Sequence, residues 1–243
     1  MRLRVVERVH YAKCPLVEVV SQINFPQMLE IDEQLPVEFQ KAVRDDFPLF
    51  ETQEQVTLAF KQVSGQLVPE PPQDNKKKLY HFFNLDKTSR ITLSSNCVNV
   101  FTSKYERWEA FTLLVDRALA ALTDTYGVKY TNRVGLRYIN IISKENIGLV
   151  GTPWAELIQP FLLGVMNGCE FLDESTAEIE NNVANFQSTT QMVIGEASIL
   201  LNHGYVLNSK TNEKAFLIDA DYSNETTKEF TRDGICSQLG AFH

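Results

Sequence analysis

Two arginines, a tyrosine and an asparagine lie within one apolar stretch of the chain, at positions 133–142. The stretch reads Arg-Val-Gly-Leu-Arg-Tyr-Ile-Asn-Ile-Ile, and its aliphatic residues are typical of a central strand that is largely apolar on both faces. Side chains repeat every second residue along a strand, so Arg133 and Arg137 share one face while Tyr138 and Asn140 share the other. Guanidinium groups bind carboxylates and phosphates, which makes this strand a candidate for ligand or partner binding.

Two interpretations of the arginines are open. Positions four apart on a strand are separated by about 13 Å, so Arg133 and Arg137 cannot grip one phosphate together, and only one of them would contact an anion or a carboxylate. In the structural interpretation, which we favour, each arginine pairs with an Asp or Glu because an isolated buried charge is costly. Glu18 is a candidate partner for Arg137 across the sheet. For Tyr138 and Asn140, the structural interpretation is a hydroxyl and an amide that are hydrogen-bonded within a core.

A second candidate site consists of carboxylates near the end of the chain. Asp219 and Asp221 share one face of a predicted strand, and Glu196 belongs to the predicted strand before it. Together they could hold a divalent metal ion in a hydrolase or nuclease-like enzyme, because oxygen ligands suit such ions. The structural interpretation is an edge strand whose charges face water and discourage pairing with another chain.

Other chemistry has no support in the spacing of the residues. The four histidines show no zinc-binding pattern, no serine lies in a GxSxG turn, and no glycine-rich phosphate loop occurs. The four cysteines are isolated, which is typical of reduced thiols. We therefore expect no catalytic residue and no cofactor. The residues concerned are His10, His81, His203 and His243, and Cys14, Cys97, Cys169 and Cys236.

Composition favours a globular protein and excludes some partners. The 243 residues are 44% hydrophobic and 22% charged, which is inside the globular range. The net charge of −8 repels phosphate backbones, so no nucleic-acid partner is expected, and Lys76–Lys78 are predicted to be a solvated loop tip. Early charges rule out a signal peptide, and no apolar run is long enough for a transmembrane segment. These features predict a cytoplasmic protein.

Hydrophobic periodicity predicts an α+β fold with a mainly antiparallel sheet and packed amphipathic helices. The predicted boundary near Lys144 to Thr152 gives two closely packed lobes, 1–146 and 147–243, which are of similar build. Predicted strands are 16–25, 55–63, 79–85, 90–93, 97–101, 130–142, 189–201 and 215–222, and predicted helices are 33–47, 105–126, 153–165 and a last one through Ile235, Leu239 and Phe242.

Four segments resemble a sporadically distributed prokaryotic protein family whose members are mostly uncharacterised. They are 11–20, the pair Tyr105 and Trp108, the strand motif Gly-Leu-Arg-Tyr-Ile-Asn with its preceding Val134, and 216–221. The resemblance covers nearly the whole chain in order. Such a patchy distribution often accompanies phage-defence loci, so the resemblance implies an accessory or sensor role in a bacterial phage-defence system. Relative to that family, the last predicted helix is short.

The sequence is compatible with three functions. We expect a non-catalytic binding or sensor protein that recognises a protein partner or small ligand through Arg133, Arg137, Tyr138, Asn140 and Glu18. The alternative is the metal-dependent hydrolase or nuclease-like enzyme that uses Asp219, Asp221 and Glu196. A third hypothesis is a homo-oligomer, for example a homodimer, which rests on an exposed apolar tail at 235–242.

Overall fold

The computed structural model describes residues 13–56, 60–63, 66–69, 76–167, 175–208 and 211–243. The described chain forms two compact units that interleave along the sequence. Unit 1 takes in the residues up to Val19 together with Arg137–Ser223, and unit 2 takes in Val20–Leu136 together with Asn224–His243. Two strands, β1 (Leu16–Asn24) and β9 (Arg133–Ile142), therefore contribute one part to each unit.

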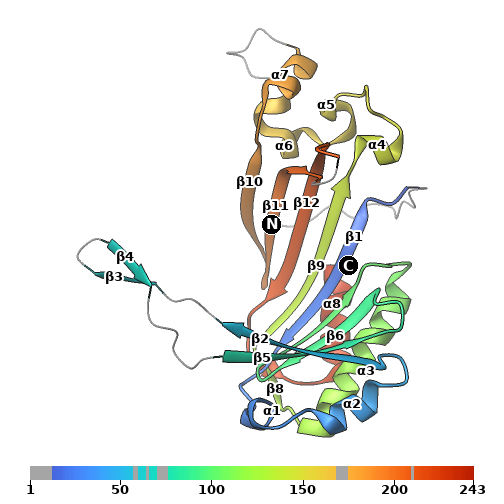
Figure 1. Cartoon of the computed structure of the whole chain (residues 1–243), viewed down its shortest axis with the longest axis vertical. Helices are drawn as coiled ribbons and strands as arrows, with labels where there is room; N and C mark the ends of the chain where they lie inside the picture. Colours follow the sequence, from blue (N-terminus) through green and yellow to red (C-terminus); the bar gives the residue numbers. More distant parts are fainter. Residues whose placement is uncertain (1–12, 57–59, 64–65, 70–75, 168–174, 209–210) are drawn as a thin grey trace. The chain divides into compact units, whose positions relative to one another are not determined.

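Unit 1 contains strands in the order β10-β11-β12-β9-β1, with short helices gathered at one end of them (Figure 1). β10 pairs antiparallel with β11, and β11 pairs antiparallel with β12. The elements not yet given are β10 (Gln187–Ile194), β11 (Ala197–Leu207), β12 (Lys214–Asn224), α4 (Lys144–Ile147), α5 (Trp154–Leu157), α6 (Pro160–Leu163), the 3-10 helix η1 (Gly164–Asn167) and α7 (Thr176–Asn182).

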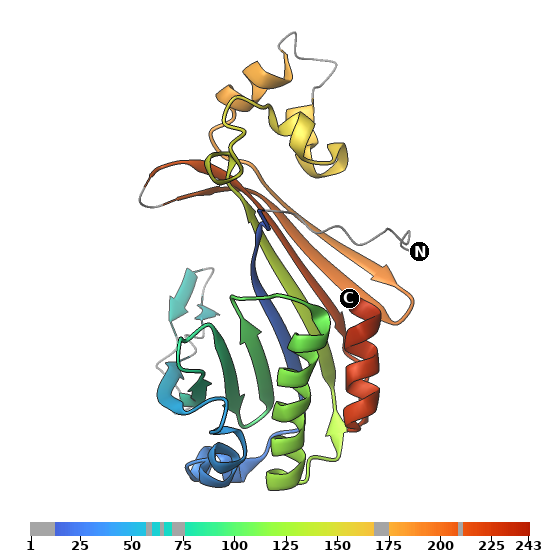
Figure 2. The ribbon, with the colours of Figure 1, turned by 90° about the vertical axis from the view of Figure 1, so that its right-hand side faces the viewer.

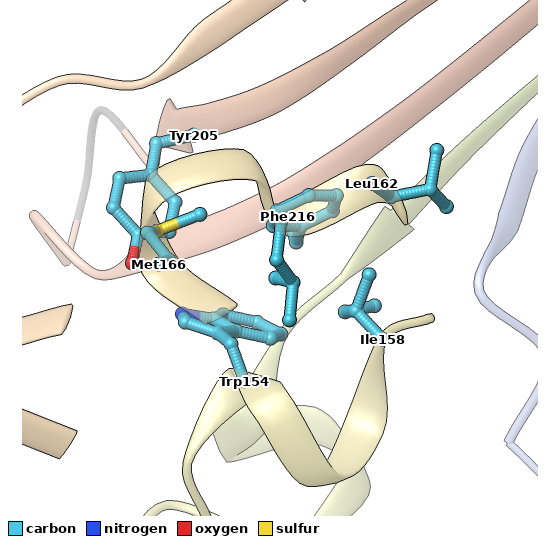
Figure 3. Packing of buried hydrophobic residues seen from close by; sticks show 7 residues of the cluster. Trp154, Ile158, Leu162, Met166, Tyr205 and Phe216 are labelled. Atoms are coloured by element: carbon cyan, nitrogen blue, oxygen red, sulfur yellow. The ribbon is translucent and has the colours of Figure 1, made fainter. Parts of the chain in front are cut away.

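The short helices of unit 1 pack on one face of its sheet around an aromatic core. Trp154 of α5 lies against Phe216 of β12, with ring centroids 5.6 Å apart, and Tyr205 of β11 meets the same Phe216 ring edge-on (Figure 3). Aliphatic side chains from the helices close the cluster. Its buried members are Trp154, Ile158, Leu162, Leu163, Met166, Tyr205 and Phe216.

Unit 2 contains strands in the order β1-β7-β6-β5-β2, in which neighbours from β7 to β2 are antiparallel. The helices α3 and α8 lie side by side in this unit (Figure 2). Two further hairpins are β13–β8 and β3–β4. The elements are α1 (Leu29–Glu33), α2 (Val37–Val43), β2 (Leu49–Val56), β3 (Phe60–Val63), β4 (Gln66–Pro69), β5 (Lys76–Phe83), β6 (Ser89–Ser94), β7 (Cys97–Thr102), α3 (Trp108–Tyr126), β8 (Tyr130–Thr131), β13 (Lys228–Glu229) and α8 (Arg232–Phe242).

The α+β class and the antiparallel character of the sheet are confirmed. β9 is flanked by β12 and β1, so its predicted central position is also confirmed, whereas the predicted strand 130–142 is divided into β8, which pairs with β13, and β9. Gly127 ends α3 in the left-handed conformation, as its position after the apolar stripe predicts. Within the described chain no helix is both long and apolar enough to cross a membrane.

Two predicted helices are wrong as single elements, because prolines divide them. The segment 33–47 contains the end of α1 and all of α2, since Pro36 stands just before α2 with a non-helical backbone. The segment 153–165 is divided into α5, α6 and the start of η1, because Pro160 begins α6 and the preceding Gln159 is extended.

Predictions near the chain end and in the basic run also need correction. The single strand predicted at 189–201 is the hairpin β10–β11, and Glu196 lies in its turn rather than in a strand. Lys76–Lys78 begin β5 instead of forming a loop tip. The apolar tail is not exposed, because Ile235 and Leu239 of α8 are buried, and α8 packs against α3.

The division into units also differs from the predicted lobes 1–146 and 147–243. That boundary follows the glycines Gly148 and Gly151, which end α4 and the turn after it. The units instead divide β1 between Val19 and Val20, and β9 between Leu136 and Arg137. A break in a hydrophobic pattern does not mark such a point.

Candidate binding site on the sheet of unit 1

Arg137 and Asp219 form a two-pronged ion pair between β9 and β12. Arg137 Nε donates to Asp219 Oδ1 at 2.7 Å, and Nη2 donates to Oδ2 at 2.8 Å. The Asp219 side chain is only 7% exposed, whereas that of Arg137 is 46% exposed. Hydrogen bonding to Asp219 raises the pKa of Arg137, against the effect of partial burial. The structural interpretation of Arg137 is therefore confirmed, whereas its role in binding stays a prediction.

The pair belongs to a row of polar side chains that crosses the strands, which we call the polar ladder: Thr189, Asn202, Asp219 and Arg137. Thr189 of β10 lies opposite Asn202 of β11, and its hydroxyl donates to the Asn202 Oδ1 at 2.8 Å. Asn202 lies opposite Asp219, and its Nδ2 donates to Asp219 Oδ2 at 3.4 Å. Residues opposite one another share a face, so the ladder lies on the face away from the aromatic core.

Negative charge predominates around Arg137. Besides Asp219, the carboxylates of Asp221 and Glu18 contribute to the raised pKa of the Arg137 guanidinium. The suggestion that Glu18 lies near Arg137 therefore has support in electrostatics, although the direct partner is Asp219. Three carboxylates act electrostatically on one guanidinium, so negative charge exceeds positive charge in this group and favours cations.

A depression beside the polar ladder centres on Gly204, and we call it the Gly204 depression. Its volume is about 270 Å³, and it is open to solvent. Gly204 has a φ of +147°, and a Cβ at this position would overlap the Phe186 carbonyl oxygen. That carbonyl accepts from the Tyr205 N–H at 2.8 Å, which holds the two backbones close. The lining residues are Gln187, Ser188, Thr189, Asn202, His203, Gly204, Tyr205, Val206, Leu217 and Asp219.

The residues predicted to bind are not brought together. Arg133 belongs to unit 2, where its Nε lies 3.9 Å from Glu225 Oε1, while Arg137 belongs to unit 1. Tyr138 and Asn140 lie on the opposite face of β9 from Arg137, because of the alternation of the strand. Only Arg137, with Glu18 near it, belongs to the site described above.

The carboxylates of the alternative site are also separated. Asp219 and Asp221 share a face of β12, but both Asp219 oxygens are bonded to Arg137, and Glu196 lies in the β10–β11 turn. Asp221 lies opposite Leu200 of β11, and Leu200 is four residues along the chain from Glu196. Among the described residues, no three His, Cys, Asp or Glu side chains are arranged to hold a metal ion.

Two titratable groups on the core face of β11 are buried. The His203 ring lies near Phe186 and Phe216, and burial lowers its pKa even though a hydrogen bond to the Leu162 backbone acts in the opposite direction. Burial also raises the pKa of Tyr205, with a contribution from Glu180. The Tyr205 hydroxyl has no hydrogen-bond partner among the described residues. Both groups therefore remain neutral near neutral pH.

Glu180 joins three helices at the edge of this core. One of its oxygens is bonded to Lys144 Nζ, and the other accepts from the Trp154 backbone N–H at 2.6 Å. The Lys144 ammonium also lies 4.4 Å from the centroid of the Trp154 ring. A buried lysine needs such partners, so this cluster holds α4, α5 and α7 together.

Thr189, Asn202 and Gly204 were not among the site residues predicted from the sequence. The available signal was the alternation of Ile199, Leu201, His203 and Tyr205, which continues past Leu201 and extends the strand to the end of β11. Gly204 and the polar residues after it were instead assigned to a loop, because glycine and asparagine favour turns.

Comparisons with known proteins add no assignment. No model of a known protein family matches the chain, and a search of curated proteins also finds no match. The resemblance to a sporadic prokaryotic family therefore stays a prediction.

Proposed function

We propose that the chain is a non-catalytic recognition protein, which receives a cationic side chain of a protein partner in the Gly204 depression. The observation that carries this proposal is the depression itself, placed directly beside the buried Asp219 carboxylate and the polar ladder. A partner side chain would contact polar groups of Asn202 and Asp219 on one side and Leu217 on the other.

Charge favours a cationic group. Asp219, Asp221 and Glu18 outnumber the single Arg137 near the ladder, which leaves an excess of negative charge. A lysine or arginine side chain also brings an apolar stem, which suits the apolar part of the lining formed by Val206 and Leu217.

Size and shape favour a side chain over a free small molecule. Ligand sites usually enclose roughly 300–1,000 Å³ and bury most of the ligand surface. The Gly204 depression has about 270 Å³ and is open, so it would leave much of a free ligand in water. A side chain that is already held by a partner protein needs only such a recess.

The metal-dependent enzyme has less support, because Glu196 lies in the β10–β11 turn and, among the described residues, no three His, Cys, Asp or Glu side chains are arranged to hold a metal ion. A sensor or accessory role in phage defence is compatible with a recognition protein. It depends on the resemblance and stays a prediction.

The test uses two lysine substitutions on the same face of β11. Asn202→Lys places an ammonium group in the depression, where Asp219 can bond to it, whereas Ser198→Lys adds the same charge outside the depression. The probes are arginine-containing peptides and the same peptides with citrulline in place of arginine, with binding measured by fluorescence anisotropy.

We expect arginine peptides to bind the native protein and Ser198→Lys, and to bind Asn202→Lys at least about tenfold more weakly. Citrulline peptides should bind weakly to all three proteins. Equal binding by Asn202→Lys and the native protein, or no preference for arginine over citrulline, would overturn the proposal.

A further inference from the structure

β10 is the outermost strand of unit 1, and β11 is its neighbour in the sheet (Figures 1 and 2). Its eight residues are Gln-Ser-Thr-Thr-Gln-Met-Val-Ile, with no charged residue and no proline. The register with β11 is one-to-one from Gln187 to Ile194, so the strand contains no bulge. Charges, prolines and bulges are the usual means by which edge strands avoid pairing with other chains. β10 has none of them.

The hydrogen-bond pattern shows which backbone groups of β10 point away from the sheet. The Tyr205 N–H donates to the Phe186 carbonyl, so Gln187 and Gly204 form a pair that does not exchange hydrogen bonds. Such pairs alternate along an antiparallel ladder. The N–H and C=O groups of Gln187, Thr189, Gln191 and Val193 therefore point outward, and no backbone partner for them occurs within the part of the chain that the structure describes.

We propose that β10 pairs antiparallel with β10 of a second copy, around a two-fold axis at Thr190. In this register Thr190 lies opposite its own counterpart, Thr189 lies opposite Gln191 of the partner subunit, and Gln187 lies opposite Val193 of the partner subunit. The two sheets then continue into one another through β10.

Three features of the strand agree on this register. It places the outward-pointing residues opposite one another, which gives about eight new backbone hydrogen bonds. It also places residues of the same sheet face opposite one another. Around a two-fold axis normal to the sheet, two opposed residues share a face only when their residue numbers add up to an even number. Moving the axis by one residue, to Thr189, would pair Gln187 with Gln191 of the partner subunit and leave Val193 without a partner in β10, so fewer of these bonds would form. No like charges meet, because β10 is uncharged.

The exposure of a side chain on β10 also supports pairing at this edge of the sheet. Val193, which points to the face of the polar ladder, is 68% exposed, and pairing would place it beside Gln187 of the partner subunit. The Gly204 depression lies at this side of the sheet, since Gln187 and Thr189 form part of its lining. The second copy would thus add its Gln191 to the rim of each depression.

The test exploits the self-opposed position of Thr190. Thr190→Lys and Thr190→Glu each place like charges directly opposite in a pair that does not exchange hydrogen bonds, where side chains are closest. Gln191→Lys is the matched control, because the two new lysines would lie diagonally and each would face a threonine. Sedimentation velocity over a concentration series gives the dimer dissociation constant, and circular dichroism checks folding.

We expect the native protein to dimerise, each Thr190 variant to dimerise at least about fivefold more weakly, and Gln191→Lys to change little. Mixing Thr190→Lys with Thr190→Glu should restore a heterodimer, which also shows that both variants are folded. A native protein that is monomeric throughout would overturn the proposal, even if β10 binds an extended peptide. Dimers that are equally stable in all variants would also overturn it.

Discussion

Two arginine–aspartate pairs share one geometry but differ in their surroundings. Arg137 binds both oxygens of Asp219 in unit 1, and Arg232 binds both oxygens of Asp116 in unit 2, at 2.9 and 2.7 Å. The arginines are similarly exposed, at 46% and 45%. The carboxylates are not, because Asp219 is 7% exposed and Asp116 is 40% exposed. The cost of losing each arginine should therefore differ.

Arg137→Ala is expected to lower the free energy of unfolding by about 2 kcal/mol, since it leaves a buried carboxylate without its main donors. Arg232→Ala should cost less than about 1 kcal/mol, because water replaces the arginine at an exposed pair. Urea unfolding of both variants measures the difference. Equal losses would show that Asp219 does not depend on Arg137 for its burial.

His203 gives the protein a pH dependence of known sign. Burial lowers the pKa of His203 below its ordinary value of 6.5. As the pH falls, the imidazole is therefore protonated in the unfolded chain before it is protonated in the folded chain. The free energy of unfolding should therefore fall as the pH decreases below about 6.5. His203→Phe keeps an aromatic ring beside Phe186 and Phe216 and should reduce this slope.

Unfolding measured at several pH values between about 7 and 5 tests the prediction. His81 also has a pKa lowered by burial, so part of the slope should persist in His203→Phe. An unchanged slope would contradict a neutral, buried His203.

Among the strands and helices, the local pattern of apolar residues was sufficient to predict an element where its apolar face continues without interruption. α3 has a regular stripe and a glycine stop, and β1 alternates up to its last residues, so both were predicted within a few residues. α5 and α6 were merged, because the spacing of apolar residues continues across Pro160 although the backbone cannot. The hairpin β10–β11 was missed because its turn contains a single glycine between two apolar runs.

The candidate site was predicted only in part, because the partners of its side chains depend on how the strands pair. The sequence indicates that Arg137 needs a carboxylate, but Glu18 and Asp219 satisfy the same requirement equally well. The register of β11 on β12 then places Asn202 beside Asp219. A register depends on contacts between distant segments, which single-strand periodicity does not contain.

Two glycines of the β10–β11 hairpin allow a test of how the depression is built. Gly195 lies in the turn with a φ of +62° and open space around it, whereas a side chain at Gly204 would meet the backbone of Phe186. Gly195→Ala should cost about 1 kcal/mol through backbone strain alone. Gly204→Ala should cost about 3 kcal/mol or more, because overlap adds to strain.

Denaturant unfolding of the two variants measures this difference. Gly204→Ala should also weaken binding of arginine peptides, since the new methyl group would displace the backbone at Phe186 and Gln187, and Gln187 lines the depression. Similar stabilities for the two variants would mean that β10 and β11 can separate at Phe186 without cost.

For the chain as a whole, prediction from the sequence is limited most by the fact that one strand, β9, belongs partly to unit 1 and partly to unit 2. Arg133 and Arg137 are four residues apart on β9, yet they belong to different units and have different ion-pair partners, Glu225 and Asp219. Sequence proximity suggested a common binding surface. The boundary between the units falls between Leu136 and Arg137, and each arginine has its ion-pair partner in its own unit.

Net charge links the two proposed interactions to ionic strength in opposite directions. Each chain carries a net charge of −8, so two copies repel one another at long range, while β10 contributes no ion pair that salt could weaken. Raising the salt concentration shortens the screening length to about 8 Å at 0.15 M, which should reduce this repulsion and strengthen the dimer.

Binding of an arginine peptide beside Asp219, Asp221 and Glu18 depends on attraction between opposite charges, so a higher salt concentration should weaken it. Dissociation constants for the dimer and for the peptide, measured across one salt series, should therefore move apart. A dimer that weakens with salt would mean that charged side chains outside β10 hold it together, and a peptide whose affinity is independent of salt would mean that the depression selects it by shape alone.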